Sequence, residues 1–377
     1  RITTYYRSKN RAQNGRDKMK TDGEFELVLD RLKGLTVAIV YIFEGENAEG
    51  FAHYHVWKSN IISGWLNAIQ NLGCRPFILD VRTFAEKAFA NTLPHIDFVV
   101  NLNCGSCTLS PMAIVPATCA FLGIPCIPCD CTAVLTGENK LHSNILAQAS
   151  GIPVPREINP EDSRGIFRPL NWGSSRGIKV GSIRNDILGI YQEFIPGFDV
   201  TTPVVFNPCS ESFAFLPSIL YVPDTQDTCW FFGENAKDTK VGYSRQIIHG
   251  ISDILREKYL HLLKTVNVQT YCRIDARIKS NNFDKIHSLP LAPLSEENLY
   301  FIEINTMPTI SSTNSFGFSY KSVGVEDECH IYLEKLKSRY KEMDVYTFLL
   351  VSSMATLLKP SAKENRIKAT PFDKCSL

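Results

Sequence analysis

The sequence predicts a mixed α/β protein that has a parallel sheet near the N-terminus and an antiparallel sheet near the C-terminus. From residue 35 to residue 131, short apolar strands alternate with helical segments, which is typical of a parallel sheet with helices on both faces. Between residues 271 and 305, two segments alternate apolar and polar side chains, as half-buried strands do. A chain of 377 residues can form two or three domains that each have a core.

The N-terminal part begins with residues 1–30, which we expect to form a flexible or loosely packed extension. The elements expected in the domain at 31–131 are a strand at 36–42, a helix at 56–72, a strand at 75–81, a short helix, a strand at 96–103, a helix at 111–122 and a strand from Ile124. Apolar residues recur on one face of the first helix, and Gly73 fits its C-terminal cap.

The ligand edge of a parallel sheet lies beyond the carboxyl ends of its strands, here near residues 44–55 and 103–110. His53 and His55 lie in the first of these loops and are candidates to contact a substrate carboxylate. Two histidines in a loop are more often solvent-facing or structural, so both interpretations stay open. No G-x-G-x-x-G motif follows the first strand, which argues against a dinucleotide site.

A central unit is predicted from residue 132 to residue 197. It starts with a helix at 135–151 and contains a Gly/Ser-rich turn at 171–177. Because glycine allows close approach, the backbone N–H groups of this turn and the hydroxyls of Ser174 and Ser175 could fold over phosphates. Many turns of this composition bind nothing, so the signal is weak by itself.

The strand that ends the central unit, residues 187–197, combines polar and apolar side chains at its end. These are Gln192, Glu193, Phe194 and Ile195. Such a mixture suits the edge and the face of an adenine ring, and it equally suits a plain hinge between domains.

The C-terminal unit is predicted to span residues 198–330, and a helical tail at 331–377 follows it. Strands are expected at 200–206 and 212–222, and then a long polar loop at 223–244 that holds Lys237 and Lys240. A helix should come next, with apolar positions at Ile247, Ile251, Ile254, Leu255 and Leu262.

Two strands close this unit, at residues 271–278 and 299–305, and side chains alternate faces along each of them. The residues expected on the core face are Ile274, Ala276, Ile278, Ile302 and Ile304. Those expected on the opposite face are Arg273, Asp275, Arg277, Phe301, Glu303 and Asn305.

Antiparallel pairing of these strands would bring Asp275, Glu303 and Asn305 together. Two carboxylates and an amide oxygen form a hard-oxygen set suited to Mg²⁺. Arg273 beside them could stabilise negative charge that develops in a transition state. The alternative is a half-buried hairpin with a solvated acidic face.

The composition argues against several classes of function. With 40 basic and 39 acidic residues, the balanced charge does not suggest a nucleic-acid or membrane-surface protein. The first 20 residues lack the apolar core of a signal peptide. The late apolar run at 345–358 is too short and too mixed to cross a bilayer. We therefore expect a cytoplasmic protein with small-molecule partners and with neither a nucleic-acid nor a membrane partner.

Four of the 12 cysteines form two close pairs, Cys104 with Cys107 and Cys126 with Cys129. The pairs enclose 18 residues, a spacing within the zinc-ribbon range. The enclosed segment, however, has the pattern of an apolar helix that leads into a strand. This favours reduced cysteines that fill apolar space over a structural zinc site, which stays open as an alternative.

Taken in order, several motifs resemble the ATP-grasp superfamily, and within it the D-alanine–D-alanine ligases, over residues 35–325. RID and EINTMP, at 273–275 and 303–308, resemble the family's R-x-D and E-x-N-T-x-P-G. Further similar segments are LGIPCIP, GENKLHSNILAQASGIPVP, FRPLNWGSSRGI and YQEFIPGFD. The resemblance implies an ATP-grasp fold: an N-terminal parallel-sheet domain, a small central lid over ATP, and a C-terminal antiparallel-sheet catalytic domain.

The resemblance also implies roles for single residues. Asp275, Glu303 and Asn305 would hold the Mg²⁺ ions, two in the family and replaceable by Mn²⁺, that bridge the phosphates of ATP. Arg273 would stabilise the acyl-phosphate and tetrahedral intermediates. The residues implied to contact ATP or cover its phosphates are Lys140, Arg168, Ser174, Ser175, Gln192, Glu193, Phe194, Ile195, Asp199 and Lys240. Lys240 and Tyr243 would lie in a loop that closes over the site, unless it is an ordinary surface loop.

The sequence departs from the family pattern mainly where amino acids would bind. Arg168 and Asn144 replace two lysines. Thr309 replaces a glycine, and residues 313–315 replace an H-S-L run that holds the acceptor, which makes Thr309, Thr313 and Asn314 substrate candidates. Residues 104–110 replace the family's H-G-x-x-G-E-D-G loop. The ATP-binding residues are kept while both amino-acid pockets differ, so we do not expect a pair of D-alanines as substrates.

The leading interpretation is an ATP-dependent carboxylate–amine ligase that works through an acyl phosphate. It would join an amino acid to a small non-standard metabolite, with a mycosporine-type amino-acid ligase as one example. The alternatives are an ATP-binding regulatory or carrier-loading module without free ligase activity, and a zinc-dependent interaction protein built on the cysteine pairs. By analogy with the family, the chain could form a homodimer.

Overall fold

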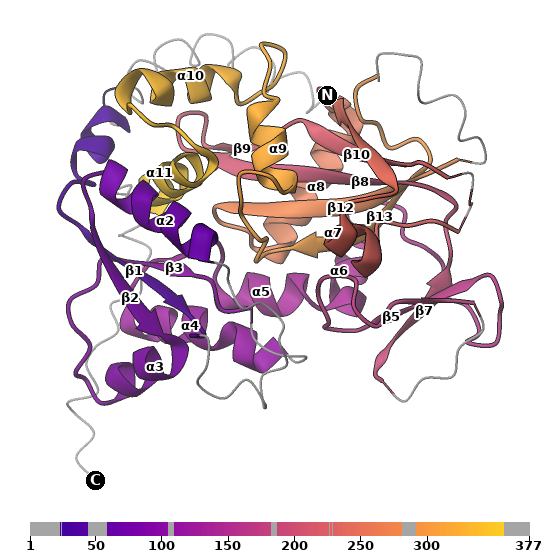
Figure 1. The fold of residues 1–377 in the computed structure, drawn as a ribbon, viewed down its shortest axis with the longest axis horizontal. Coiled ribbons are helices and arrows are strands. Elements are labelled where there is room, and N and C mark those ends of the chain that lie inside the picture. The colour runs from indigo at the N-terminus through magenta and orange to yellow at the C-terminus, as the bar shows by residue number, and fades with distance from the viewer. Residues whose placement is uncertain are drawn as a thin grey trace, which may run out of the picture.

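Three β-sheets organise the chain in the computed structural model, which describes residues 23, 25–43, 59–104, 109–181, 187–225, 227, 229–280 and 292–357. They are a four-stranded parallel sheet, a three-stranded antiparallel sheet and a six-stranded antiparallel sheet. In Figure 1 the parallel sheet lies on the left, the small sheet at the lower right and the large sheet at the upper right. The predicted mixed α/β class, with a parallel sheet followed by an antiparallel one, is confirmed.

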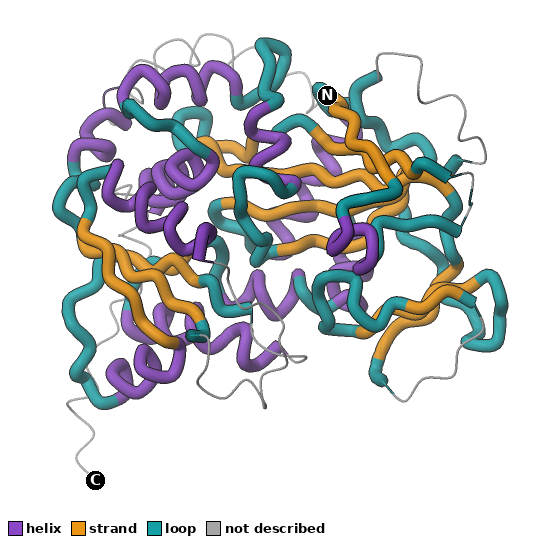
Figure 2. The backbone as a smooth tube through the Cα atoms, viewed as in Figure 1, coloured by secondary structure: helices purple, strands orange, loops and turns teal. Residues whose placement is uncertain are grey.

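The parallel sheet has helices on both faces (Figure 2). Its strand order is β2-β1-β3-β4, with bounds Thr36–Tyr41 for β1, Arg75–Asp80 for β2, Phe98–Asn101 for β3 and Cys126–Ile127 for β4. Val37 and Ile39 pack in one core with α2 (Ser59–Asn71) and α11 (Val345–Leu357). Ala38 and Val40 pack in another with α3 (Val81–Phe89) and α4 (Leu109–Leu122). The alternation of side chains along β1 therefore separates the two helical layers.

The central unit contains a helix pair and the small sheet. The sequence predicts one helix at 135–151, but the structure has α5 (Cys131–Gly137) and α6 (Lys140–Ala149). The side chain of Asn139 accepts hydrogen bonds from the backbone N–H groups of Leu141 and His142, so it caps the start of α6. The single-helix prediction is wrong because Asn at such a cap starts a new helix.

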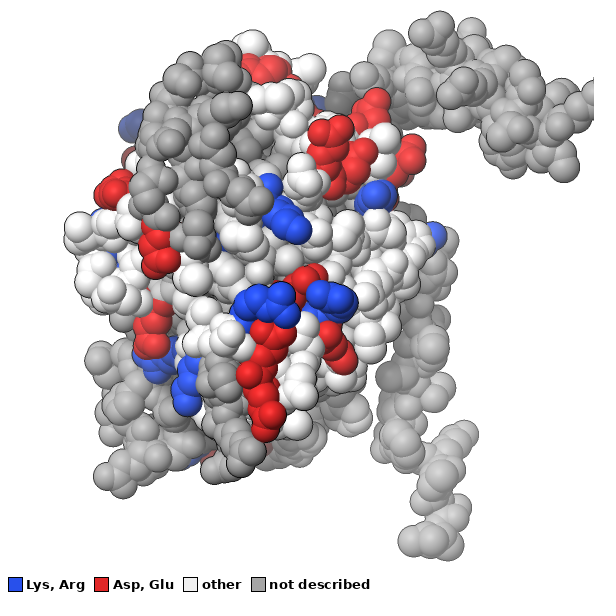
Figure 3. Space-filling model, turned by 90° about the vertical axis from the view of Figure 1, so that its right-hand side faces the viewer, with Lys and Arg blue, Asp and Glu red and all other residues white. Residues whose placement is uncertain are grey.

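The small sheet has the order β6-β5-β7, with β5 at Gly165–Pro169, β6 at Lys179–Val180 and β7 at Gly189–Glu193. Viewed from this side of the molecule, basic and acidic side chains lie next to one another in small groups on a mostly uncharged surface (Figure 3). Within this unit, two ion pairs join Arg156 to Glu193 and Arg164 to Asp162.

The large sheet has the order β11-β10-β8-β12-β13, and β9 pairs with β8. Its strands are β8 (Gly197–Asn207), β9 (Ser212–Phe215), β10 (Ser218–Pro223), β11 (Tyr243–Ile248), β12 (Tyr271–Lys279) and β13 (Leu299–Asn305). Two predictions fail here. Ile247 belongs to β11 rather than to a helix, since α8 (Asp253–Val266) begins after its cap Ser252, and Ile254 is exposed. The predicted loop at 223–244 contains a short helix, α7 (Glu234–Thr239).

A bulge between β12 and β13 changes which side chains of β13 face the core. Asp275 pairs with Glu303 and the next residue, Ala276, pairs with Phe301, so Ile302 is the extra residue. The strict alternation predicted for this strand is therefore wrong at two positions. Phe301 is fully buried in the core, and Ile302 instead lines a cavity.

The chain ends that the structure describes belong to the core around α2. The last helices are α9 (Ser315–Lys321), α10 (His330–Arg339) and α11, and α11 packs on α2 through an edge-on contact of Trp65 with Tyr346. Phe25, Val28 and Leu29 are buried in the same core, so the expected loose packing is wrong for residues 25–30. No helix in the described part of the chain is long and apolar enough to cross a membrane.

The contact between α2 and α11 gives a first testable prediction. A Cβ atom at Gly64 would lie 2.4 Å from ring atoms of Tyr346. Gly64→Ala should therefore lower the free energy of unfolding by about 1–3 kcal/mol, as overpacking does, despite the better helix propensity of alanine. Urea unfolding measures the change. Ser63→Ala, exposed on the same helix, is the control and should stay within about 0.5 kcal/mol. Equal stability of both variants would contradict the close contact.

Candidate active site

A cavity of about 740 Å³ lies between the small sheet and the large sheet, within the usual size range of small-molecule sites. Strands β8, β12 and β13 contribute to one wall, and β5, β7 and the turn at 171–177 contribute to another. Further lining comes from α7 and the segment before it, from the residues before α9, and from α2 and α4 of the part that contains the parallel sheet. Parts of all three sheet-containing units therefore contribute to this cavity.

The cavity brings together residues that are far apart in the sequence. The predicted site residues among its lining are Lys140, Arg168, Ser174, Ser175, Gln192, Glu193, Phe194, Ile195, Asp199, Lys240, Arg273, Asp275, Glu303, Asn305, Thr309, Thr313 and Asn314. His53 and His55 lie outside the described residues. The shared location fits the predicted site, while the role of each residue stays a prediction.

The predicted metal ligands lie on adjacent strands at matched positions. Asp275 is directly opposite Glu303, and Arg273 is directly opposite Asn305. The guanidinium of Arg273 donates to both oxygens of Asp275, at 2.9 Å to Oδ1 and 2.7 Å to Oδ2. Thr201 also donates its hydroxyl to Asp275. This wall thus combines two carboxylates, an amide and a fixed arginine, and the oxygen donors fit the chemistry of Mg²⁺.

Glu303 is surrounded by cations from the other unit. Its Oε2 lies 3.6 Å from Lys140 Nζ and 3.4 Å from Arg168 Nη2. Burial by itself would raise the pKa of Glu303, but the nearby cations, led by Lys140 and Arg168, lower it to about 2. Because the folded-state pKa lies below the ordinary 4.5, this charge stabilises the fold above that pH and the contribution is lost as pH falls toward 2. Glu303 is therefore ionised at any physiological pH.

Lys140 and Arg168 are themselves held in place. Lys140 donates to the carbonyl of Trp172 at 2.6 Å, and burial lowers its pKa. Arg168 donates to the carbonyl of Ile302 at 2.9 Å. Together with the two ion pairs to Glu303, the Arg168 contact joins α6 and β5 to β13. The ion cluster of Lys140, Arg168 and Glu303 therefore connects the central unit to the large sheet.

The predicted adenine hinge is already internally bonded. Gln192 donates its amide N–H to the carbonyl of Pro155 at 2.9 Å and accepts from Arg168 at 3.4 Å. Glu193 accepts from the backbone N–H of Arg156. The side-chain amide of Gln192 is therefore engaged at both ends, and the backbone N–H groups of Glu193 and Phe194 donate to the carbonyls of Arg156 and Arg164.

Arg277, to which the sequence pattern assigns no role, holds the hinge to the segment before α7. Its guanidinium donates to the carbonyls of Ile195, Gly197 and Trp230 and to Asp199 Oδ2, at distances of 2.7–3.0 Å. Asp199 Oδ2 also accepts from the backbone N–H of Phe232 at 2.6 Å. Asp199, predicted to contact a ribose, thus lines the cavity with one oxygen already bound. Only the tertiary structure shows these contacts of Arg277, because most of its partners are backbone atoms.

The turn at 171–177 reaches across the cavity and docks on α7. Ser174 and Ser175 both adopt left-handed backbone conformations, with φ values of 58° and 62°. Ser175 accepts a hydrogen bond from Lys237, and Arg176 pairs with Glu234 at 3.2 Å. The two units therefore form a roof over the cavity.

Lys237 is the lysine of α7 that faces the site. It lines the cavity, and burial lowers its pKa. The sequence points instead to Lys240, which lines the cavity from an exposed position at the end of α7. The sequence predicts a loop at 223–244 and therefore does not predict α7. Without this helix, Lys237, which faces the cavity, could not be told apart from the exposed Lys240.

Glu138 is a second residue that the sequence analysis missed. Its Oε1 accepts hydrogen bonds from Thr306 N at 2.6 Å, Thr306 Oγ1 at 3.0 Å and Met307 N at 3.2 Å. Burial raises its pKa, and so does Glu303. Since Asn305 accepts from the same Met307 N–H, Glu138 fixes the turn that positions the amide oxygen of Asn305.

The predicted substrate residues Thr309, Thr313 and Asn314 line the part of the cavity next to the start of α9, which is named the substrate end below. Asn314 caps α9 by accepting from Gly317 N, and it donates to the carbonyl of Thr309, so its side chain has a structural role. Arg245 donates to the carbonyl of Thr313 at 3.0 Å and lies 4.1 Å above the ring of Phe318.

The cavity as a whole is basic. Its lining contains seven basic and five acidic residues, an excess of two. The basic residues are Lys140, Arg168, Lys237, Lys240, Arg245, Arg273 and Arg277, and the acidic ones are Glu138, Glu193, Asp199, Asp275 and Glu303. Such a lining favours an anionic ligand while keeping carboxylates for a cation.

Three of the four cysteines considered for zinc are buried, namely Cys104, Cys126 and Cys129, while Cys107 lies outside the described residues. Burial raises the pKa of Cys104 and Cys129 far above the ordinary value, which disfavours the thiolates that zinc needs. Within the described residues, His249, Glu326 and Asp327 are the only group of three histidine, cysteine or carboxylate side chains whose ligand atoms lie within 4.8 Å of one another.

Several known proteins that are similar to this chain are ligases. No protein-family model matches it. The D-alanine–D-alanine ligase of Petrotoga mobilis is 22% identical over 286 residues, which cover 69% of this chain and 85% of that enzyme. The D-alanine–D-alanine ligase of Thermotoga maritima is 25% identical over 281 residues, which cover 69% of this chain and 86% of that enzyme.

Solved structures show the same relation for the fold. The D-alanine–D-alanine ligase of Bacillus anthracis complexed with ATP superposes with a TM-score of 0.55 at 16% identity, covering 88% of this chain and 99% of that one. The VanG D-Ala:D-Ser ligase of Enterococcus faecalis gives 0.54 at 13% identity, covering 85% and 98%. The chain is therefore a distant homologue of the D-alanine–D-alanine ligases and has their ATP-grasp fold, which confirms the resemblance seen in its sequence.

The role of Glu138 can be tested without any ligand. Glu138→Ala leaves the N–H groups of Thr306 and Met307 without this acceptor and should lower the free energy of unfolding by about 1–3 kcal/mol. Glu138→Gln keeps an acceptor oxygen and should lose less than half of that. Glu161→Ala, an exposed site on the central unit, is the control for urea unfolding. If Glu138→Ala and Glu161→Ala unfold alike, the turn does not depend on Glu138.

Proposed function

We propose that this protein is an ATP-dependent ligase that joins the carboxylate of one small molecule to the amine of another. One observation carries the proposal: Asp275, Glu303 and Asn305 line the same wall of a basic cavity in an ATP-grasp fold. A module that only binds nucleotide has no need for a complete set of metal-poised oxygens. The distant homology to ligases supports the same reaction class.

The donor set fits Mg²⁺, with Mn²⁺ as a substitute, since two carboxylates and an amide on adjacent strands offer hard oxygens to the same cavity. Asp275, Glu303 and Asn305 would hold the ions, two by analogy with the family. When bound, the metal would neutralise phosphate charge and keep the γ-phosphoryl group open to attack. The basic residues that remain for the phosphates include Lys140, Lys237 and Lys240, whose charges suit a nucleoside triphosphate.

The chain's own residues would do three things in the reaction. The hinge at 192–195 and Asp199 would hold the nucleoside. The roof formed by Ser174, Ser175 and Lys237 would cover the phosphates and exclude water from a labile acyl phosphate. Arg273, fixed by its ion pair with Asp275, would stabilise the negative charge that develops when the amine attacks the activated carboxyl group.

The substrates are proposed to differ from a pair of D-alanines. Thr309, Thr313 and Asn314 line the cavity together with Arg245, and in the sequence comparison Thr309 stands for a glycine and residues 313–315 for the family's H-S-L run. One structural neighbour is a D-Ala:D-Ser ligase, so ligases of this fold are not limited to D-alanine as acceptor. An amino acid and a small non-standard metabolite, as in mycosporine-type ligation, form the proposed pair, and His53 and His55 remain candidates to contact it.

The decisive experiment measures release of ADP and phosphate with Mg²⁺-ATP across pooled amino acids and carboxylic acids, with mass detection of products. We expect ADP to form with one acid–amine pair and a product lighter by one water than their sum. Tight ATP binding without turnover in any pool would favour the regulatory or carrier-loading module instead. Failure to bind ATP would overturn both functions.

The metal assignment gives a separate prediction. Glu303→Gln removes a carboxylate that is ionised at all working pH values, and it should reduce Mg²⁺-dependent ATP turnover at least about 100-fold, the usual scale for such electrostatic groups. Steady-state kinetics at saturating Mg²⁺ measures the loss. Glu334→Gln, which removes an exposed ion pair on α10, is the matched control. Near-normal turnover of Glu303→Gln would remove Glu303 from the metal site.

A further inference from the structure

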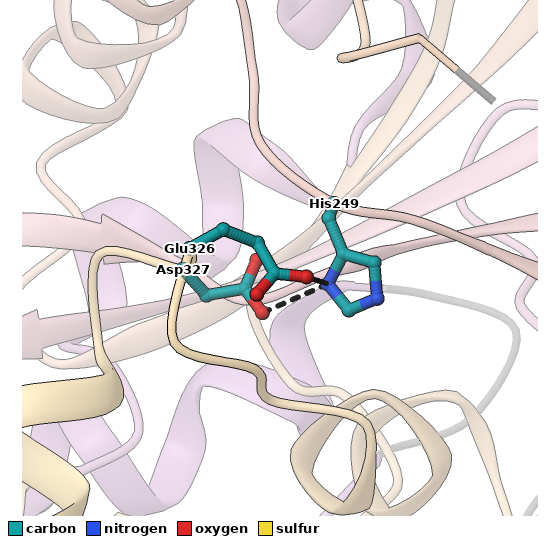
Figure 4. A group of neighbouring side chains, drawn as sticks. All are labelled: His249, Glu326 and Asp327. Atoms are coloured by element: carbon teal, nitrogen blue, oxygen red, sulfur yellow. Dashed lines mark hydrogen bonds and ion pairs between the residues drawn. The ribbon is translucent and has the colours of Figure 1, made fainter. Parts of the chain in front are cut away.

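Three side chains from two separate loops converge at a point outside the cavity (Figure 4). His249 follows β11, while Glu326 and Asp327 lie between α9 and α10. The Nδ1 atom of His249 lies 3.0 Å from Asp327 Oδ2 and 3.2 Å from Glu326 Oε1. Figure 4 shows both carboxylates directed at this one nitrogen, with the other ring nitrogen turned away.

We propose that His249, Glu326 and Asp327 form a binding site for a divalent transition-metal ion, independent of the ligase reaction. The donor set has one imidazole nitrogen and two carboxylate oxygens, which suits Zn²⁺ or Mn²⁺ better than the all-oxygen preference of Mg²⁺ or Ca²⁺. Neighbouring ligands at about 2.1 Å from a metal in octahedral geometry lie about 3.0 Å apart. The separations from Nδ1 to the two oxygens match this value, and water would complete the coordination.

The negative charges of Glu326 and Asp327 favour a bound cation. The two carboxylates share one imidazole nitrogen, which as a neutral group can donate a proton to only one of them. In the part of the chain that the structure describes, neither carboxylate forms an ion pair with a lysine or arginine. The carboxylate of Asp327 is only 1% exposed, so water cannot offset its charge. A divalent ion would balance both acids at once.

The backbone around Gly324 shapes the site. Its N–H donates to Asp327 Oδ2 at 2.7 Å, which orients that carboxylate toward His249. A Cβ atom at Gly324 would lie 2.6 Å from Glu326 Oε2, so a side chain here would push the second carboxylate away. Glycine at this position therefore leaves the space that the Glu326 carboxylate occupies beside His249.

A metal bound here would tie the edge strand of the large sheet to the connection between α9 and α10. Strand β11 carries Arg245, and α9 follows directly after Thr313 and Asn314. The ion would thus fix two segments that line the substrate end of the cavity. Its expected effect is on stability and on the positions of these segments, because His249, Glu326 and Asp327 are not among the residues that line the cavity.

Titration of the metal-free full chain with Mn²⁺, with free ion followed by electron paramagnetic resonance, tests the proposal. Wild type should bind one equivalent more than His249→Ala, or bind it at least about tenfold more tightly. Gly324→Ala should weaken the same equivalent without removing any ligand. His95→Ala, which removes an exposed histidine paired with a single aspartate, is the matched control and should bind as wild type does.

If His249→Ala does not fold, Glu326→Gln provides a second test. Glu326 is half exposed, so its replacement should leave the fold intact, and it should weaken the binding of the same equivalent of Mn²⁺. Mn²⁺ should also raise the midpoint of thermal unfolding of wild type more than that of Glu326→Gln. Identical stoichiometry and affinity in all variants would overturn the proposal. A rise in thermal stability with acid alone, with no Mn²⁺ bound at this site, would likewise overturn it and assign the group to a protonated His249 between two carboxylates.

Discussion

The charge of Glu303 is the constraint on which the functional site depends. A partly buried carboxylate is costly unless cations compensate it, and here the compensation comes from Lys140 on α6 and Arg168 on β5. The small sheet and the large sheet are therefore joined by the same group that is proposed to bind metal. This explains how one residue can hold the cavity together and also shape its chemistry.

Arg277 on β12 also holds parts of the cavity wall together. Its contacts with the hinge and with Trp230 hold the segment before α7 against β12. With Ser175 and Lys237 in contact, parts of two units form the roof over the cavity.

Much of the fold and part of the site could be predicted from the sequence. The apolar strands of the parallel sheet and the alternating pattern of β12 are local signals, and they set the α/β class and the placement of Arg273 and Asp275 on one face. The predictions failed where local signals compete. A cap at Asn139 divides a helix, and a bulge at Ile302 sends Phe301 into the core.

The sequence by itself determined which residue types are present and at what spacing, and hence the distant relation to ATP-grasp ligases. Only the tertiary structure decided which of them meet. No local pattern assigns a role to Glu138, Lys237 or Arg277, and their partners lie far away in the sequence. The convergence of His249 with Glu326 and Asp327 is of the same kind. Long-range contacts of this sort depend on how sheets and loops pack, which no local pattern encodes.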